Sequence, residues 1–348
     1  MDRFSLGSLT DVPGIQVGHY QRQGRGWLTG TTTVFAPDGA VAAVDVRGGG
    51  PGTRETDALA AGNLVDRVHA VCLSGGSAYG LATADGVMAE LEARQLGVPV
   101  GLAPHEIVPV VPTAVIFDLG RGGRFDRRPT PEFGQRALKA ARRTSRRGSI
   151  GAGTGAQSGG IRGGVGMASA QVTIGAHTVT VGALMVVNSS GSAIDPATGL
   201  PYVPVAGIQS PSEDERTAVA TALQTAWASP PLNTTIGVIA TDAALSRPEA
   251  GRMALSGHDG LARAIRPAHG LMDGDTIFGL STGTVAIETG DVDMDRSGTL
   301  RPFLLNTLFA VAADLVALAC TDAVVSASPT DSVPSWASLC PHGVIERP

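Results

Sequence analysis

Apolar runs of strand length recur along this chain and are its clearest structural signal. They read GIQVGHY, TTTVFAP, GAVAAVDV, HAVCLSG, VPTAVIFDL, QVTIGAHTVTVGALMVV, TIGVIATDA and TIFGLSTGTVAIET. Several are continuously apolar rather than alternating, which is the pattern of strands covered on both faces. We therefore predict sheets that are buried between other layers.

Helical patterns mark three segments between these runs. Residues 77–96 place four apolar side chains on one face and stop at Gly97. Capping-box signatures open two more helices, which we expect at 212–227 and 246–265. Because strands and helices come in groups rather than in strict alternation, the sequence favours a layered α+β fold.

The segment from Phe303 to Val325 is the closest approach to a membrane span. Asn306, Asp314 and Asp322 interrupt its apolar run at intervals of about two helical turns. Such polar residues are costly in hydrocarbon. We predict a buried core helix here and no membrane association.

One stretch lacks a clear pattern of either kind. Residues 121–149 are rich in arginine and interrupted by glycine and proline. We expect a flexible, solvated segment, with RRTSRRGS as a weaker candidate for a phosphate-binding patch.

Composition narrows the class of protein. The chain has 348 residues, 43% hydrophobic and 16% charged, with a net charge of −5, which indicates a globular protein and argues against nucleic acid as a partner. The first residues show no apolar signal segment, and three cysteines form no CxxC pair, so we expect a cytoplasmic location with reduced thiols. Lys139 is the only lysine, which excludes a Walker-type lysine.

The glycine-rich stretch from Gly151 to Gly166 invites comparison with nucleotide-binding loops. No GK[ST] follows it, and more glycines stand where a helix would begin a dinucleotide fingerprint. Two interpretations stay open: backbone amides that approach a small substrate or an oxyanion, and a purely structural cluster of turns.

We expect neither a metal nor another cofactor. DVDMDRSG (291–298) resembles the first half of a calcium loop, but Arg296 and Pro302 stand where glycine and glutamate are needed, so a polar hairpin loop is the better interpretation. The seven histidines have no ligand spacing, and His258 and His269 are expected to pack or to form hydrogen bonds.

The dipeptide Asn233-Thr234 carries the most informative chemistry. It follows Pro230-Pro231 and opens the apolar run TIGVIATDA. If the bond before Thr234 is cut, that residue has a hydroxyl nucleophile and a free α-amine that can act as its general base. Taken alone, the dipeptide is more typical of a turn that feeds a strand.

Polar residues elsewhere could complete such a site. Asp273 and Asp275 flank Gly274 in a turn before a strand, where they could hold the α-ammonium of Thr234 or form an ordinary Asp-Gly turn. Asn188 ends the run VGALMVVN, where its amide could donate to an oxyanion or simply tolerate a turn.

Ten blocks in order give a resemblance along nearly the whole chain. They are DVPGIQVGHY, TTTVFAP, DVRGGGPGTRETD, LSGGSAYGLATADGVM, VPTAVIFDL, GAGTGA, GALMVVN, NTTIGVIATDA, GHDGLARAI and DGDTIFGLSTG. With them the chain resembles the L-aminopeptidase/D-amidase/esterase family, which includes β-aminopeptidases and the nylon-oligomer endo-hydrolase. The resemblance implies an N-terminal-nucleophile hydrolase with a four-layer αββα sandwich, made active by autoproteolysis.

The resemblance also implies roles for individual residues. Thr234 matches the nucleophile and Asn233 the residue before the cut, so a single hydrolase domain, 1–348, would yield an α chain (1–233) and a β chain (234–348). Asn188 matches a catalytic asparagine, and Asp273 and Asp275 match a pair that surrounds the nucleophile. Candidate substrate contacts are Tyr79 and Arg162. Related sequences usually have a lysine after GAGTGA, where this chain has Ser158-Gly159-Gly160, and Arg162 is the candidate to replace its charge.

The expected partners are a small peptide, an aminoacyl amide or an amide oligomer, and further copies of the chain in a tetramer of processed protomers. Two alternatives stay open on the same fold. One is an acyltransferase of the ornithine acetyltransferase type, and the other is an uncleaved, non-catalytic binding protein.

Overall fold

The computed structural model of the protein describes residues 6–226, 233–287 and 300–343. Its main strands are β1 (Gln16–Gly24), β2 (Trp27–Val46), β4 (Arg67–Ser74), β7 (Thr113–Val115), β10 (Gly164–Ile174), β11 (His177–Asn188), β12 (Thr234–Ala243) and β13 (Thr276–Val285). Shorter strands are β3 (Thr53–Arg54), β5 (Val98–Pro99), β6 (Ile107–Val108), β8 (Gln157–Ser158) and β9 (Ile161–Arg162). The α-helices are α1 (Thr83–Ala93), α2 (Pro131–Lys139), α3 (Glu213–Ala226), α4 (Arg247–Ala264), α5 (Leu300–Val325) and α6 (Trp336–Leu339).

One long strand, β2, joins two halves of the sheet. The strand order is β10-β11-β12-β13-β2-β4-β7-β3, with β1 paired to β2 outside this path. Residues 31–35 and 40–41 of β2 pair with β4, and residues 41–46 pair with β13. The register shifts between Phe35 and Ala40, at Pro37-Asp38-Gly39, because proline cannot donate to the ladder. The sequence predicts two strands here, and the structure joins them into one irregular strand.

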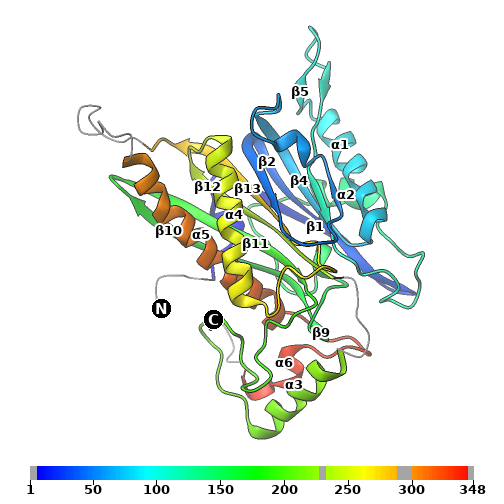
Figure 1. The fold of residues 1–348 in the computed structure, drawn as a ribbon. Helices are drawn as coiled ribbons and strands as arrows, with labels where there is room; N and C mark the ends of the chain where they lie inside the picture. The colour runs from blue at the N-terminus through cyan, green and yellow to red at the C-terminus, as the bar shows by residue number, and fades with distance from the viewer. Residues whose placement is uncertain (1–5, 227–232, 288–299, 344–348) are drawn as a thin grey trace.

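Alternation along the strands separates three apolar layers. In β12, Ile236 and Val238 face a central core between the two halves of the sheet, whereas Ile239 faces a second core beneath α4 and α5. In β4, Val71 faces the central core and Cys72 faces a third core beneath α1 and α2. The order of layers is therefore α4/α5, sheet, sheet, α1/α2, which confirms the four-layer αββα sandwich (Figure 1).

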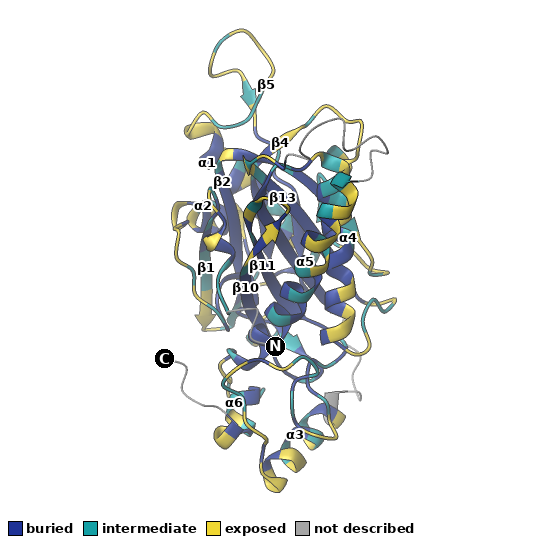
Figure 2. Cartoon of the chain, turned by 90° about the vertical axis from the view of Figure 1, so that its left-hand side faces the viewer, coloured by how far each residue is buried: buried dark blue, intermediate teal, exposed yellow. Residues whose placement is uncertain are grey.

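The helices follow their sequence signals, except that the segment predicted at 77–96 begins as a 3-10 helix, Ser77–Ala82, and continues as α1. Ser246 and Glu249 form the predicted capping box, and α4 ends at Ala264. Helix α5 has the length and hydropathy of a membrane span, but it packs on α4, β10 and β11, as predicted for a core helix. The buried strands and the more exposed outer faces of the helices are visible in Figure 2.

The stretch 121–149 differs from its prediction as a flexible, solvated segment. It contains helix α2, and the side chains of Phe133 and Leu138 on the inner face of this helix are fully buried. The Tyr20 ring meets the Phe133 ring edge-on and the Trp27 ring stacks on it, at 4.9 and 5.7 Å between centroids. The apolar face of α2 is short and lies among arginines, so it leaves little periodicity in the sequence. The segment DVDMDRSG lies outside the described residues.

Candidate active site

Four strand ends meet at one edge of the sheet. β11 is antiparallel to β12, so its last residue, Asn188, pairs with the first residue of β12, Thr234. β13 is parallel to β12 and begins at Thr276, directly after Asp275. Val46, at the end of β2, pairs with Thr276. The topology thus gathers the predicted residues at one place, although they come from distant parts of the chain.

The Thr234 hydroxyl lies directly on the peptide bond that precedes it. Its Oγ1 donates a hydrogen bond to the carbonyl oxygen of Asn233. Gly274 lies against the same hydroxyl, since a Cβ atom there would be 2.9 Å from Oγ1 and 2.7 Å from the Gly50 carbonyl oxygen. A side chain at position 274 would therefore collide with the site, which explains glycine between the two aspartates.

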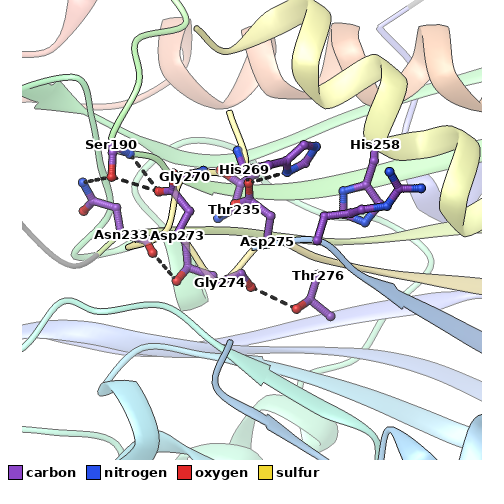
Figure 3. A network of polar contacts seen from close by, with 12 residues as sticks. Ser190, Asn233, Thr235, His258, His269, Gly270, Asp273, Gly274, Asp275 and Thr276 are labelled. Carbon is purple, nitrogen blue, oxygen red and sulfur yellow. Dashed lines mark hydrogen bonds and ion pairs between the residues drawn. The ribbon is translucent and has the colours of Figure 1, made fainter. Parts of the chain in front are cut away.

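The two aspartates lie on one side of Thr234 and accept hydrogen bonds from different groups. Asp273 Oδ1 accepts from the Ser190 hydroxyl at 2.9 Å, and its Oδ2 accepts from the Gly270 amide at 3.0 Å. Asp275 Oδ1 accepts from the Thr235 amide at 2.7 Å (Figure 3). Burial, and then the charge of Asp275, raise the pKa of Asp273 above its ordinary value. We call Asp273, Asp275 and His269 the acidic side of the site.

His269 connects Asp275 to a second histidine. Its Nδ1 lies 2.8 Å from Asp275 Oδ2, and its amide donates to the same oxygen at 3.1 Å. The His258 ring packs edge-on against it, 4.9 Å between centroids. Burial is the main cause that lowers the pKa of His258 to about 4, so this ring is neutral at pH 7. Both rings pack and form hydrogen bonds, as the sequence predicts.

The loop that contains Gly48, Gly49 and Gly50 holds the turn from Asp273 to Asp275 through backbone hydrogen bonds. The Gly50 amide donates to the Asp273 carbonyl at 2.7 Å, and the Arg47 amide donates to the Asp275 carbonyl at 2.9 Å. A Cβ atom on Gly48 would lie 2.3 Å from the Asp273 carbonyl oxygen. The block DVRGGGPGTRETD therefore holds the turn through its backbone, a role that its sequence alone does not indicate.

Arg121 lies on the opposite side of Thr234, and sequence reasoning misses it. Its Nη1 donates to Asn188 Oδ1 and, at 2.8 Å, to the Gly155 carbonyl; its Nη2 donates to Asn233 Oδ1 at 3.1 Å. Burial lowers the pKa of Arg121 to about 10, which still leaves the guanidinium charged at pH 7. We call Asn188, Arg121 and Asn233 the cationic side of the site.

Hydrogen bonds at both the oxygen and the nitrogen of its side-chain amide hold Asn188 in place. Its Oδ1 accepts from Arg121 and from the Gln157 amide at 3.1 Å, and its Nδ2 donates to the Phe117 carbonyl at 3.3 Å. Gln157 and Gly155 belong to the glycine-rich stretch, which thus packs behind Asn188. Each of these contacts fixes the direction of the Asn188 amide relative to Thr234.

The two predicted substrate contacts lie in different surroundings. The Tyr79 ring is 52% exposed, and the Arg128 guanidinium lies 3.5 Å from its centre. Arg162 is 1% exposed, and its guanidinium donates to the carbonyls of Ser328 and Thr154. Arg162 thus ties together segments of the main chain, a structural role that its sequence does not suggest. Substrate contact by either residue stays a prediction.

Within the described ranges, no three side chains of histidine, cysteine, aspartate or glutamate gather as metal ligands would. The four side chains that surround the 233–234 bond are almost completely buried: Asn188 at 0%, Thr234 at 5%, Asp273 at 3% and Asp275 at 2% exposed. A carbonyl, a hydroxyl, two carboxylates and a guanidinium shielded from water can support acyl transfer without a metal.

Comparison with known proteins identifies relatives along most of the chain. The profile of peptidase family S58 matches residues 7–335. An uncharacterized aminopeptidase of Mycobacterium tuberculosis is 46% identical over 347 residues, covering 97% of this chain and 98% of that protein. A 6-aminohexanoate-oligomer endohydrolase of Kocuria sp. is 33% identical over 299 residues, covering 80% of this chain and 76% of that protein.

Solved structures agree on the fold. A Burkholderia sp. β-aminopeptidase matches with a TM-score of 0.69 at 23% identity, covering 99% of this chain and 96% of that one. The L-aminopeptidase D-Ala-esterase/amidase of Ochrobactrum anthropi matches with a TM-score of 0.67 at 20% identity, covering 93% and 87%, and is described as a variant of the Ntn hydrolase fold. The chain therefore belongs to peptidase family S58 and is an amidohydrolase with the fold of the N-terminal-nucleophile hydrolases.

Proposed function

We propose that Thr234 is the nucleophile and that the chain activates itself by cutting the bond between Asn233 and Thr234. The observation that carries the proposal is the Thr234 hydroxyl bonded to the carbonyl oxygen of Asn233, inside a buried polar site. The hydroxyl attacks that carbonyl carbon, and the peptide nitrogen leaves as the new α-amine. Water then hydrolyses the resulting ester and separates residues 1–233 from 234–348.

In turnover, the new α-amine takes the proton of the Thr234 hydroxyl while the oxygen attacks a substrate amide. The leaving amine departs with that proton, and water hydrolyses the acyl-enzyme. Asp275 is the group that orients the α-amine, because its Oδ1 already accepts from the amide of the next residue, Thr235. One Asn188 N–H donates to the Phe117 carbonyl, and the other is our proposed donor to the oxyanion.

The substrates we propose are short amides with an amino-acyl group. The names of the relatives, an aminopeptidase and an amide-oligomer endohydrolase, support this class. Family membership also favours hydrolysis over acyl transfer or binding alone. We further propose a single hydrolase domain, a cytoplasmic location and a homotetramer of processed protomers. The first two are supported by the continuous layers of the fold and by three buried free thiols, and the tetramer by the family resemblance.

Intact-mass spectrometry of the purified protein tests the proposal. We expect two chains that end at Asn233 and begin at Thr234, together with hydrolysis of aminoacyl anilides. Thr234→Ala should give one uncut chain and no measurable hydrolysis. Thr234→Ser should retain part of the self-cleavage and part of the hydrolysis, since it keeps a hydroxyl and an α-amine. A wild-type protein that stays in one piece and still hydrolyses amides would refute it.

A further inference from the structure

We infer that the place occupied by Asn233 is the acyl-side subsite of the mature enzyme, and that Arg121 and Ser190 select carboxamide side chains there. The inference rests on the proposed function and extends it to a substrate class, namely amides of asparagine-like acyl residues.

The first step of the argument is chemical. In self-cleavage, Thr234 attacks the carbonyl of Asn233, so Asn233 is the acyl residue of that reaction. In turnover the same hydroxyl attacks a substrate carbonyl at the same point in space. Once residues 1–233 withdraw their new end, the acyl residue of a substrate takes the position that Asn233 held. The contacts of Asn233 are therefore a template for those of the substrate.

The second step is the set of contacts itself. Asn233 Oδ1 accepts from Arg121 Nη2 at 3.1 Å, and Asn233 Nδ2 donates to the Ser190 hydroxyl at 3.4 Å. The Asn233 amide donates to the Met272 carbonyl at 3.4 Å. A substrate with a free α-amine would find the same carbonyl as an acceptor, which suits an aminopeptidase. Asn233 is 3% exposed, so these contacts form away from water.

The third step concerns what the subsite rejects. Arg121 is also bonded to Asn188 and Gly155, so its guanidinium is fixed in place. An aliphatic acyl side chain would leave Nη2 buried without an acceptor, and sites built around such a hydrogen bond discriminate strongly against analogues that lack it. A cationic side chain would meet the guanidinium charge directly.

The fourth step separates a carboxamide from a carboxylate. Either group offers an oxygen to Arg121, but only the carboxamide can donate to the Ser190 hydroxyl. Ser190 in turn donates to the Asp273 carboxylate at 2.9 Å, which places a negative charge just beyond it. The carboxylate of an aspartyl substrate would thus be attracted by the charge of Arg121 and repelled by the charge of Asp273. We expect the order asparaginyl, aspartyl, leucyl.

The test measures kcat/KM of the mature enzyme on p-nitroanilides of asparagine, aspartate, alanine and leucine. We expect asparaginyl anilide to exceed leucyl anilide by about 10- to 100-fold. Ser190→Ala should reduce the ratio of asparaginyl to aspartyl rates by about 3- to 10-fold and change the aspartyl-to-leucyl ratio much less. Equal rates on asparaginyl and leucyl anilides, within a factor of three, would overturn the inference.

Self-cleavage provides a second readout that needs no external substrate. In a cell-free synthesis time course followed by gel, Asn233→Leu should slow cleavage at least 10-fold, and Asn233→Asp should slow it less. Arg121→Met should slow cleavage more in the chain that retains Asn233 than in Asn233→Leu, because only part of its effect, the hydrogen bond to Asn233, is already lost in Asn233→Leu. Independent, multiplying effects would contradict the inference.

The outcomes also separate this inference from the proposed function. If Thr234→Ala is cut or retains hydrolysis, the nucleophile assignment fails and the subsite inference fails with it. If the wild type is cut at 233–234 and hydrolyses anilides without preferring asparagine, the nucleophile stands and only the subsite inference fails.

Discussion

The two sides of Thr234 have opposite charge and opposite hydrogen-bonding character. On the acidic side, the carboxylates of Asp273 and Asp275 only accept, and their donors are amides, a hydroxyl and His269. On the cationic side, Arg121 only donates, and its acceptors are neutral oxygens of Asn188, Gly155 and Asn233. Thr234, the proposed nucleophile, lies between them, paired with Asn188 on one side and in contact with Gly274 on the other.

This difference assigns a separate task to each side. A group that takes and releases a proton is best placed beside carboxylates, because they stabilise its ammonium form. A carbonyl under attack is best placed beside fixed donors, because negative charge develops on its oxygen. The acidic side therefore suits the α-amine, and the cationic side suits the acyl group.

The largest effect on the acidic side is expected from Asp275→Asn. The change keeps the shape and an oxygen for the Thr235 amide but removes the charge beside the α-amine. We expect kcat/KM for aminoacyl anilides to fall about 10²- to 10³-fold, since orienting a general base contributes on this scale. Steady-state kinetics on protein with a verified Thr234 N-terminus measures the loss.

The matched control for Asp275→Asn is Asp314→Asn. Asp314 pairs with Arg263 at 2.6 Å on the surface of helices α4 and α5. Replacing it by asparagine therefore removes the same charge, but on an outer face of the fold. Its kinetics should equal those of the wild type. A threefold or smaller effect of Asp275→Asn would mean that the acidic side does not hold the general base.

A smaller effect, on pH dependence, is expected from Asp273→Asn. A nearby carboxylate raises the pKa of an ammonium, so removing one lowers the pKa of the α-amine. The neutral amine that acts as base then becomes available at lower pH. We expect the rising limb of the kcat profile that belongs to this amine to move to lower pH by about 0.5 to 1 unit. A shift to higher pH would show that Asp273 acts on another group.

Sequence reasoning reaches the site residues at strand ends more easily than it reaches Arg121. Thr234, Asn188 and Asp275 stand where continuous apolar runs begin or end, so their positions at strand ends are predictable. Arg121 lies in a stretch without periodicity, and it meets Asn233 across 112 positions of sequence. That contact depends on how layers pack, which no local pattern encodes. The same holds for helix α2 and for the backbone role of Gly48 to Gly50.

The last expected effect, on stability rather than on catalysis, concerns Asp118, which lies behind the cationic side. Asp118 Oδ1 accepts from the Gly76 amide at 2.7 Å, and its charge raises the pKa of Arg121 against the effect of burial. Burial raises the pKa of Asp118 itself from 3.8 to about 6. The folded protein therefore holds this proton more tightly than the unfolded chain, and stability falls as pH rises from about 4 to about 6.

Asp118→Asn should remove the loss of stability that accompanies ionisation of this carboxyl. We expect the free energy of unfolding to rise by about 1–3 kcal/mol at pH 8, with the gain vanishing below pH 4, where the wild-type carboxyl is protonated in both states. Urea titrations at both pH values measure this, in a Thr234→Ala background so that a single chain unfolds. A variant that is less stable at pH 8 would mean that the Asp118 charge supports Arg121 by more than its burial costs, and that the cationic side depends on a buried counter-ion.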